Sequence, residues 1–520
     1  MINRRLLSSL GLGLVLAYGL AVVLNPRFRP DQIGPYALLV LILALVSGWR
    51  QFRAPPRSFW LVVLAGVLLI PGVTIARGFG RIDMISMLFH ADFGMAGATL
   101  DGLEGEITQA CLSAVVICLC LALLGGLWHW RARVMLGLCL GLLIANPVLR
   151  AAGIALATPA VHSDLVQRFQ PPALIANPAE RPDLVVLYLE GTDRQFADPQ
   201  VWPGLYDPLH ALAAEGLSFT RIGQIEGTGW SMAGMLATQC GVPIVAKSLS
   251  YRNNFSGTDR FMPSLACLGD VLGGLGYNRS YVVGGAKEFG GIDALYRTHG
   301  QFRQIDIEVQ KTLYPPAEIE AALGGWVLDD QMVLQTARTE FTTLAATPDP
   351  LLLVVETIGP HGRKGILSRR CGDGAAVSLS TDARAVVSCL VTEAVDFVRD
   401  IQREHAETRP GRRLQVAILS DHLSHNKTLP DVAAPYQQAN TVILLGGAGP
   451  QGRVIDKPGA MIDVYPTILD WAGLLAPPRA AHLGRSLLRP APTITEAHGL
   501  ALFDRMLVSD VSLANLIWAD

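Results

Sequence analysis

In Leu184-Val-Val-Leu-Tyr-Leu-Glu190, six apolar residues are followed by a carboxylate. A short continuous apolar run is typical of a strand buried on both faces of a sheet. Similar runs recur along the chain with helical patterns between them, and this alternation predicts an α/β domain with a mostly parallel central sheet. The runs are Ser280–Val283, Leu351–Val355, Leu414–Leu419 and Thr441–Leu445, and the helical patterns are Asp329–Leu344 and Leu379–Glu404.

Polar residues follow three of these runs. Glu190 follows the first, residues 357–361 follow Leu351–Val355, and Asp421-His422 follow Leu414–Ser420. Ligands of such sheets gather beyond the carboxyl ends of the strands. Taken singly, an acidic residue here is more often a surface carboxylate or a helix cap. Together, two carboxylates and an imidazole suit one divalent ion, Mn²⁺, Zn²⁺ or Mg²⁺, and we expect Glu190, Asp421 and His422 to bind it.

A candidate nucleophile lies in Glu226-Gly-Thr-Gly-Trp-Ser-Met-Ala-Gly-Met235, a glycine-containing turn that leads into a helical pattern. The start of a helix favours phosphate, and a metal lowers the pKa of a hydroxyl that ligates it. Ser231 is therefore the expected nucleophile and a metal ligand, with Thr228 as a rival. The simpler alternative is that either hydroxyl only caps the helix. The metal candidates favour the catalytic interpretation.

His361 is a further catalytic candidate, within the glycine-rich loop Gly359-Pro-His-Gly-Arg-Lys-Gly365. The cationic Arg363 and Lys364 beside it suit an anionic substrate. A lone loop histidine is more often just exposed, so its candidacy depends on following a strand expected next to that of Asp421. Other candidates of the same kind are His425, Lys427, Arg369 and Arg370.

Long apolar stretches dominate the chain from Leu6 to about Ala157, whereas charged residues and prolines take over after Ser163. Crossing a bilayer core of ~30 Å takes about 20 mostly apolar residues in a helix. The pattern predicts a transmembrane domain of residues 1–158, with about five spans, and a catalytic domain of residues 159–520. The spans are Leu6–Leu24, Tyr36–Ser47, Phe59–Val73, Ile107–Leu127 and Val134–Leu156.

The arginines predict the orientation of these spans. Those before the first span, between the second and third, and between the fourth and fifth lie in the cytoplasm under the positive-inside rule. An odd number of spans then places the catalytic domain outside. We expect the first span to be an uncleaved anchor rather than a signal peptide, and Met84–Leu100 to form a short amphipathic helix at the interface. The arginines are Arg4, Arg5, Arg50, Arg53, Arg57, Arg131 and Arg133.

The cysteines fit this division. Four lie in apolar spans, where they behave as small hydrophobes, and four lie in the outer domain, where an oxidising compartment allows disulfides. We expect Cys240 to pair with Cys267 and Cys371 with Cys389; a zinc site is the alternative, but the close spacing it usually requires is absent. The net charge of -2 gives no indication of a nucleic-acid partner. The cysteines within spans are Cys111, Cys118, Cys120 and Cys139.

These motifs resemble the alkaline phosphatase and sulfatase superfamily, and within it the membrane-anchored lipoteichoic acid synthases and phosphoethanolamine transferases. The resemblance covers most of the outer half. Its pieces are Leu184–Glu190, Gly227–Cys240, Ser420-Asp421-His422, Ile462–Asp470 and Gly484-Arg-Ser-Leu-Leu488.

Gly227–Pro243 more narrowly resembles the bacterial phosphoglycerol transferase I family, which modifies periplasmic glucans. That family is expected to have threonine at the position of Ser231, so the chain departs there but keeps a hydroxyl. The Cys/Ser-x-Pro-x-Arg segment of hydrolytic sulfatases does not occur at the expected place.

The resemblance implies a bacterial inner-membrane enzyme with a cytoplasmic N-terminus, a periplasmic catalytic domain and one divalent ion, Mn²⁺ before Zn²⁺ or Mg²⁺. Ser231 would attack phosphatidylglycerol, releasing diacylglycerol, and a sugar hydroxyl of a periplasmic glucan would then take the phosphoglycerol. His361 would hold the phosphoglycerol or assist the leaving group. The alternatives are transfer of phosphoethanolamine, polymerisation of glycerol phosphate, and a catalytically idle membrane receptor.

Overall fold

The computed structural model describes residues 4–25, 30–79, 84–93, 104–157, 159–176, 178–245, 260–362, 364–372, 374–424, 438–447 and 451–519. The chain forms two compact units. The first comprises Met1–Met84 and Leu100–Pro159, and the second comprises Ile85–Thr99 and Ala160–Asp520.

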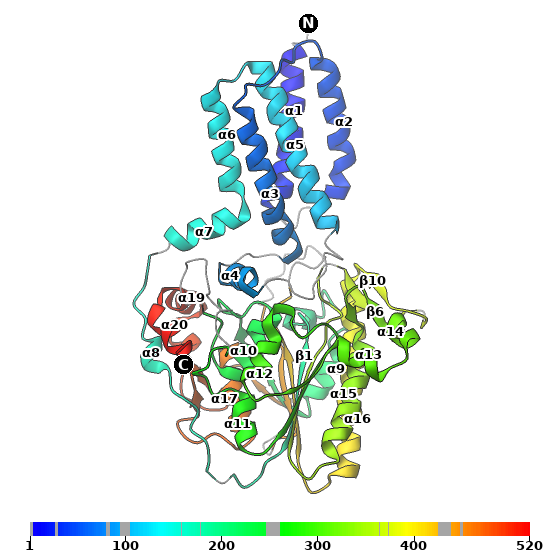
Figure 1. The fold of residues 1–520 in the computed structure, drawn as a ribbon, viewed down its shortest axis with the longest axis vertical. Helices are drawn as coiled ribbons and strands as arrows, with labels where there is room; N and C mark the ends of the chain where they lie inside the picture. Colours follow the sequence, from blue (N-terminus) through cyan, green and yellow to red (C-terminus); the bar gives the residue numbers. More distant parts are fainter. Residues whose placement is uncertain are drawn as a thin grey trace. The chain divides into compact units, whose positions relative to one another are not determined.

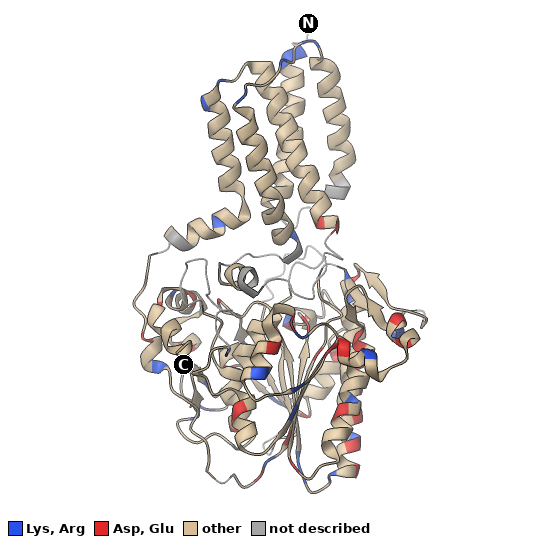
Figure 2. Ribbon diagram, viewed as in Figure 1, with Lys and Arg blue, Asp and Glu red and all other residues tan. Residues whose placement is uncertain are grey.

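The first unit is helical (Figure 1). Within the described residues, three helices are long and apolar enough to cross a membrane, namely Arg4–Leu24, Phe59–Arg77 and Glu104–Trp128. Their charged residues lie only near their ends (Figure 2). The helices are α1 (Arg4–Leu24), α2 (Pro30–Gly48), α3 (Phe59–Phe79), α5 (Glu104–Trp128), α6 (Ala132–Ala145) and α7 (Pro147–Ala157).

The predicted count of five spans is slightly too high. The stretch Val134–Leu156 is broken into α6 and α7, which meet at an angle of 75° and make a fourth span only if the bent pair is counted as one. Pro147 has no N–H to continue α6, and the Asn146 side chain instead accepts from the N–H groups of Val148 (2.9 Å) and Leu149 (3.3 Å). The apolar part of α2, Ile33–Gly48, is shorter than a full span.

The second unit is built on an eight-stranded sheet of order β13-β2-β12-β11-β1-β8-β4-β5 (Figure 1). Strands β11, β1, β8, β4 and β5 run parallel, whereas β12 is antiparallel to both of its neighbours. The prediction of a mostly parallel sheet is confirmed. The strands are β13 (Arg453–Ile455), β2 (Gly216–Phe219), β12 (Val442–Leu445), β11 (Leu414–Ser420), β1 (Asp183–Leu189), β8 (Leu351–Glu356), β4 (Asn278–Val283) and β5 (Arg303–Ile305).

Both faces of the sheet are covered by helices, which explains why β1 is apolar throughout. Its alternate residues belong to different cores: Leu184, Val186 and Tyr188 to one, and Val185, Leu187 and Leu189 to the other. The first core is completed by α10 (Ser231–Cys240), α11 (Leu268–Gly274), α12 (Ile292–Thr298), α17 (Val464–Trp471), α19 (Leu500–Ser509) and α20 (Val511–Ile517), and the second by α9 (Asp207–Ala213), α15 (Asp330–Ala345) and α16 (Ala383–Thr408).

Two predicted helical patterns differ in the structure from what was expected. The pattern Leu379–Glu404 begins with a strand, β10 (Ser378–Ser380), and α16 starts only after Asp382, whose carboxylate accepts from two N–H groups of the first turn. The pattern Met84–Leu100 gives α4 (Met84–Phe93), and its Ile85 and Phe89 are buried in the core of the second unit.

Candidate functional site

The sheet register brings the predicted metal ligands together. Leu189 of β1 pairs with Ser420 of the parallel strand β11, so Glu190 and Asp421 leave the same edge as neighbours. Both carboxylates are buried, as is His422. One ligand atom from each of the three residues lies within 4.8 Å of the other two. The sequence-predicted trio is therefore a single cluster.

The spacing inside this cluster fits a shared cation. Nε2 of His422 lies 3.1 Å from Oδ2 of Asp421 and 3.6 Å from Oε1 of Glu190. Ligands bound about 2.1 Å from one metal ion stand roughly 3.0–3.4 Å apart. The other ring nitrogen, Nδ1, lies 2.8 Å from the carbonyl oxygen of Leu423, which can only accept. A neutral imidazole then carries its lone pair on Nε2, the nitrogen that faces the carboxylates.

Among the described residues, one oxygen of Asp421 lacks a hydrogen-bond donor. Its Oδ1 accepts from the N–H groups of Gly191 (2.7 Å) and His422 (2.8 Å). Its Oδ2 is buried and accepts no hydrogen bond from the part of the chain that the structure describes. Burial raises the pKa of Asp421 to about 6, and the nearby carboxylate of Glu190 adds to the rise. A cation would satisfy this oxygen and offset the repulsion, so the residues fit a metal.

Ser231 is the residue that meets this cluster. It is the first residue of α10, and its Oγ lies 3.4 Å from Oε2 of Glu190. The contact is longer than a typical O–H···O hydrogen bond. The hydroxyl also interacts with the carboxyl group of Asp421. Ser231 thus combines a position at a helix N-terminus with contact to two candidate metal ligands.

Glycines bring α10 this close to the sheet edge. A Cβ on Gly234 would lie 1.7 Å from the carbonyl oxygen of Asp421, so only glycine permits the approach of the helix to the end of β11. Gly227, in the turn before the helix, has a φ of 73°, and a Cβ there would lie 2.1 Å from the carbonyl oxygen of Ile244. The glycines of the motif therefore fix where Ser231 stands.

Thr228, the rival nucleophile, is engaged elsewhere. Its side chain is buried, and Oγ1 donates to the carbonyl oxygen of Ile225 at 2.7 Å while accepting from the N–H of the same residue at 3.1 Å. These two bonds close the turn that leads into α10. The geometry favours Ser231 as the nucleophile and gives Thr228 a role in shaping the turn.

Glu356 is a site residue that the sequence interpretation missed. It ends β8, beside β1, and is paired with Tyr188 in the register. Burial raises its pKa to about 8; the carboxylates of Asp421 and Glu190 add to the rise, and hydrogen bonds from Tyr281 and Ser231 oppose it. A carboxylate that directly ends an apolar run was the available signal, but the polar residues were counted only from Thr357 onward.

His361 is not a member of the ligand cluster. It is half-buried in the loop after β8, and its ring lies 5.8 Å from Trp326 and 6.2 Å from Phe289, both edge-on. The buried carboxylate of Asp330 holds the start of this loop by accepting from the N–H groups of Ile358 (2.7 Å) and Gly359 (3.0 Å). His361 therefore lies in an aromatic cluster beyond the strand next to β1.

The other cationic candidates contribute less to the site. Arg369 forms an ion pair of 3.1 Å with Asp329, and Arg370 lies against Asp396 on the surface. Lys364 is exposed. Arg363, His425 and Lys427 lie outside the described residues.

The last two motifs of the resemblance, Ile462–Asp470 and Gly484–Leu488, brace α17, which shares a core with α10. Asp470 at the end of the first motif accepts from Nε and Nη2 of Arg489, each at 2.7 Å, and from the hydroxyl of Ser486 at 2.7 Å. Asp463 accepts from the N–H of Arg485 at 2.8 Å. These bonds fasten Gly484–Leu488 to α17, so both motifs are structural in this chain.

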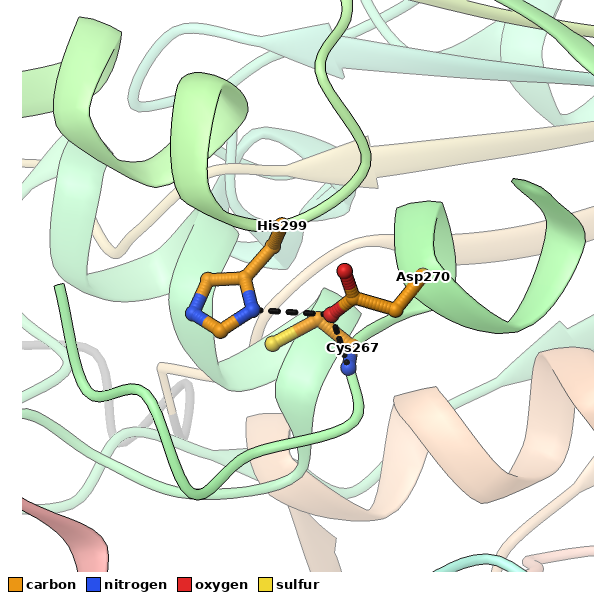
Figure 3. A group of neighbouring side chains, drawn as sticks. All are labelled: Cys267, Asp270 and His299. Carbon is orange, nitrogen blue, oxygen red and sulfur yellow. Dashed lines mark hydrogen bonds and ion pairs between the residues drawn. The ribbon is translucent and has the colours of Figure 1, made fainter. Parts of the chain in front are cut away.

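Both predicted disulfides are present, Cys240–Cys267 and Cys371–Cys389. The first joins the last residue of α10 to the residue that precedes α11. Cys267 also lies beside Asp270 and His299, a second group with metal-binding residue types (Figure 3). Its sulfur is bonded to Cys240, and the two ring nitrogens of His299 lie 2.8 Å from oxygens of Asp270 and Phe261. This group is a structural support for α10 rather than a zinc site, since a thiolate is needed to bind metal.

The similarity to known proteins agrees with these features. A phosphoglycerol transferase I from Xanthomonas campestris pv. campestris is 28% identical over 87% of this chain and 64% of its own length. One from Salmonella paratyphi B is 27% identical over 86% of this chain and 59% of its own length. This chain is similar to phosphoglycerol transferase I. The resemblance inferred from the motifs is confirmed, although the chain spans less than two thirds of the length of these phosphoglycerol transferases.

No protein-family model matches the chain. Among solved structures, an alkaline phosphatase superfamily protein from Vibrio parahaemolyticus has a TM-score of 0.48 at 18% identity, covering 66% of this chain and 78% of its own. The lipoteichoic acid synthase LtaP from Listeria monocytogenes has a TM-score of 0.45 at 15% identity, covering 61% of this chain and 79% of its own.

Proposed function

We propose that the chain is a membrane-anchored, metal-dependent transferase that moves phosphoglycerol from phosphatidylglycerol to a periplasmic glucan. The observation that supports this most is that Ser231, at the start of α10, meets Glu190 and Asp421-His422 at one edge of the sheet. The similarity to phosphoglycerol transferase I supports the choice of cargo.

The reaction takes two steps at Ser231. In the first, Oγ attacks the phosphorus of the lipid, the bond from phosphorus to the diacylglycerol oxygen breaks, and diacylglycerol leaves with a proton. In the second, a sugar hydroxyl attacks the same phosphorus and Ser231 regains its proton. A covalent phosphoglycerol ester on the enzyme lets one site serve a lipid donor and a water-soluble acceptor in turn.

The N-terminus of α10 supports the phosphoryl group. The first N–H groups of an α-helix have no partner within the helix and carry the positive end of its dipole. Because Ser231 opens α10, a phosphorus atom attached to its Oγ would have oxygens within reach of these donors. The N-terminus of α10 thus stabilises the negative charge that develops on the phosphoryl oxygens during the reaction.

One divalent ion, Mn²⁺ in first place with Zn²⁺ or Mg²⁺ as alternatives, is proposed to be held by Glu190, Ser231, Asp421 and His422. When bound, it supplies the positive charge that lowers the pKa of a coordinated hydroxyl and balances the phosphoryl oxygens. The chain provides buried carboxylates and an oriented imidazole for it. His361, in its aromatic cluster, is proposed to hold the phosphoglycerol or assist the leaving group.

The membrane-spanning helices keep this site near its lipid. The arginines of the predicted inner loops support a cytoplasmic N-terminus. We place the chain in a bacterial inner membrane with its catalytic unit in the periplasm, where a lipid donor and a glucan acceptor are both available. Anchoring raises the effective concentration of the donor.

The test uses the full chain in detergent micelles with phosphatidylglycerol labelled in its headgroup, a periplasmic glucan and Mn²⁺. The proposal expects diacylglycerol and labelled glucan in equal amounts, both lost with Ser231→Ala or after metal removal. Label that stays in the lipid while a phosphoethanolamine lipid is consumed would contradict the cargo. A labelled glycerol phosphate polymer would contradict the acceptor, and no turnover with any donor would support an idle receptor.

A further inference from the structure

The N-terminus of the nucleophile helix lacks the usual cap. Trp230 occupies the N-cap position of α10, and its side chain makes no capping hydrogen bond. Ser, Thr, Asp or Asn normally holds this position and fixes the first turn through a side-chain oxygen. The packing of the Trp230 ring is therefore a second influence on the direction of α10 at Ser231, beside the close approach that the glycines allow.

The ring of Trp230 packs against α4. The Phe89 ring lies 5.4 Å from it, centroid to centroid, and Phe89 is fully buried. Phe89 also contacts Phe261 at 6.5 Å, edge-on, and Phe261 contacts Trp518 at 5.2 Å. The indole nitrogen of Trp518 donates to the carbonyl oxygen of Val245 at 2.9 Å. Phe89 is thus the link between Trp230 and a chain of buried rings.

The origin of α4 in the sequence is unexpected. Residues 80–83 join it to the end of α3 and residues 94–103 join it to the start of α5, so both of its ends continue into membrane-spanning helices. Nevertheless, residues 85–99 belong to the catalytic unit, and Ile85 and Phe89, four residues apart on one helix face, are buried in its core. A segment that lies between two long apolar helices in the sequence thus contributes to the core that packs against α10.

We propose that α4 is a positioning element of the catalytic site and that Phe89, through Trp230, sets the direction in which α10 presents Ser231. This inference rests on the proposed function of Ser231. A small misplacement of a reacting group costs rate steeply, with about 1 Å worth up to a hundredfold. Phe89 packs on Trp230 and Phe261 rather than joining the candidate metal ligands among the described residues, so its effect should fall on turnover rather than on metal binding.

The experiment compares Phe89→Ala, Phe89→Leu and Met87→Ala in the full chain in detergent micelles. Met87 is half-buried on the same helix and is the matched control. Hydrolysis of bis(p-nitrophenyl) phosphate with Mn²⁺ gives kcat and KM well below the melting temperature. We expect kcat to fall about ten- to hundredfold with Phe89→Ala and less with Phe89→Leu. The half-saturating Mn²⁺ concentration should be unchanged, and Met87→Ala should match the wild type.

A second readout does not depend on activity. Hydrogen–deuterium exchange of a peptide spanning residues 228–235 should be faster in both Phe89 variants and unchanged in Met87→Ala. Wild-type exchange and a kcat within twofold of wild type would overturn the proposal, even with a lower melting temperature, because that pattern means a role in stability alone. Where Phe89→Ala does not fold, Phe89→Leu decides by the same criteria. Full activity of Ser231→Ala would instead contradict the proposed function, and the exchange data would still decide the role of α4.

Discussion

The hydroxyl oxygen of Ser231 lies 3.4 Å from Oε2 of Glu190, although 41 residues separate them in the chain. The contact exists because Glu190 directly follows β1 and the glycines before and within α10 let that helix start directly over the strand end. A hydroxyl and a carboxylate so placed are what the proposed covalent mechanism requires.

Removal of the Ser231 hydroxyl should abolish turnover. We expect Ser231→Ala to lower kcat by roughly a thousandfold or more with labelled phosphatidylglycerol, since covalent catalysis depends on that oxygen. Ser231→Thr keeps a hydroxyl and should retain measurable activity. Thr228→Val should lower the melting temperature by breaking the turn at Ile225 while leaving part of the activity. Loss of all activity in Thr228→Val with Ser231→Ala still active would reverse the assignment.

Removal of a ligand oxygen should weaken metal binding. Asp421→Asn loses the charge of a buried carboxylate whose Oδ2 has no donor among the described residues. We expect the affinity for Mn²⁺ to fall about 100-fold or more, because even residues behind the ligands typically contribute 10–100-fold. Equilibrium dialysis with metal analysis measures this. Asp463→Asn is the control, since that buried carboxylate accepts from backbone N–H groups outside the cluster, and equal losses in both variants would contradict the prediction.

A methyl group on Gly234 should push α10 away from the sheet edge. The added Cβ would lie 1.7 Å from the Asp421 carbonyl oxygen, which is backbone and cannot turn aside. We expect Gly234→Ala to lose about 1–3 kcal/mol of stability, as in other overpacked sites, together with most of kcat. Gly274→Ala, where no atom lies within 4 Å of the new Cβ, is the matched control in another helix. Thermal melting and turnover of both variants provide the comparison.

Asp330 should make stability depend on pH. Burial raises the pKa of its carboxyl group to about 8, against about 3.9 in an unfolded chain. Between these values the folded protein binds more protons than the unfolded one, so the free energy of unfolding falls as the pH rises from about 4 to about 8. Asp330→Asn keeps an acceptor for Ile358 and Gly359 but cannot ionise. Its melting temperature relative to wild type should therefore rise from pH 5 to pH 8, and a constant difference would contradict this.

Much of the sheet and its cluster of candidate metal ligands could be predicted because the signals are local. A run such as Leu184–Leu189 is apolar only if both faces of the strand are covered, and Glu190 and Asp421-His422 follow such runs directly. The same logic would have found Glu356, had the carboxylate at the end of the run been counted. These features follow from periodicity and from the convergence of parallel strands at one edge.

The features that could not be predicted from the sequence depend on contacts between segments that are far apart in the chain. Nothing in the local pattern shows that Phe89, in a short helix between apolar spans, packs on Trp230, or that the Thr228 hydroxyl hydrogen-bonds with Ile225. The predicted count was too high because hydropathy ignores the break at Asn146-Pro147 and because the apolar part of α2 is shorter than a full span. Tertiary packing decides which side chains contact one another and where a helix bends, and a single sequence does not show that packing.

The most direct test of the central claim is mass spectrometry of the full chain quenched during turnover of phosphatidylglycerol with Mn²⁺. If Ser231 is the nucleophile beside the cluster of Glu190, Asp421 and His422, the peptide that contains it should gain one glycerophosphoryl group. That adduct should be absent without metal and in Ser231→Ala. Continued turnover with Ser231 unmodified, or with the adduct on Thr228, would contradict the claim.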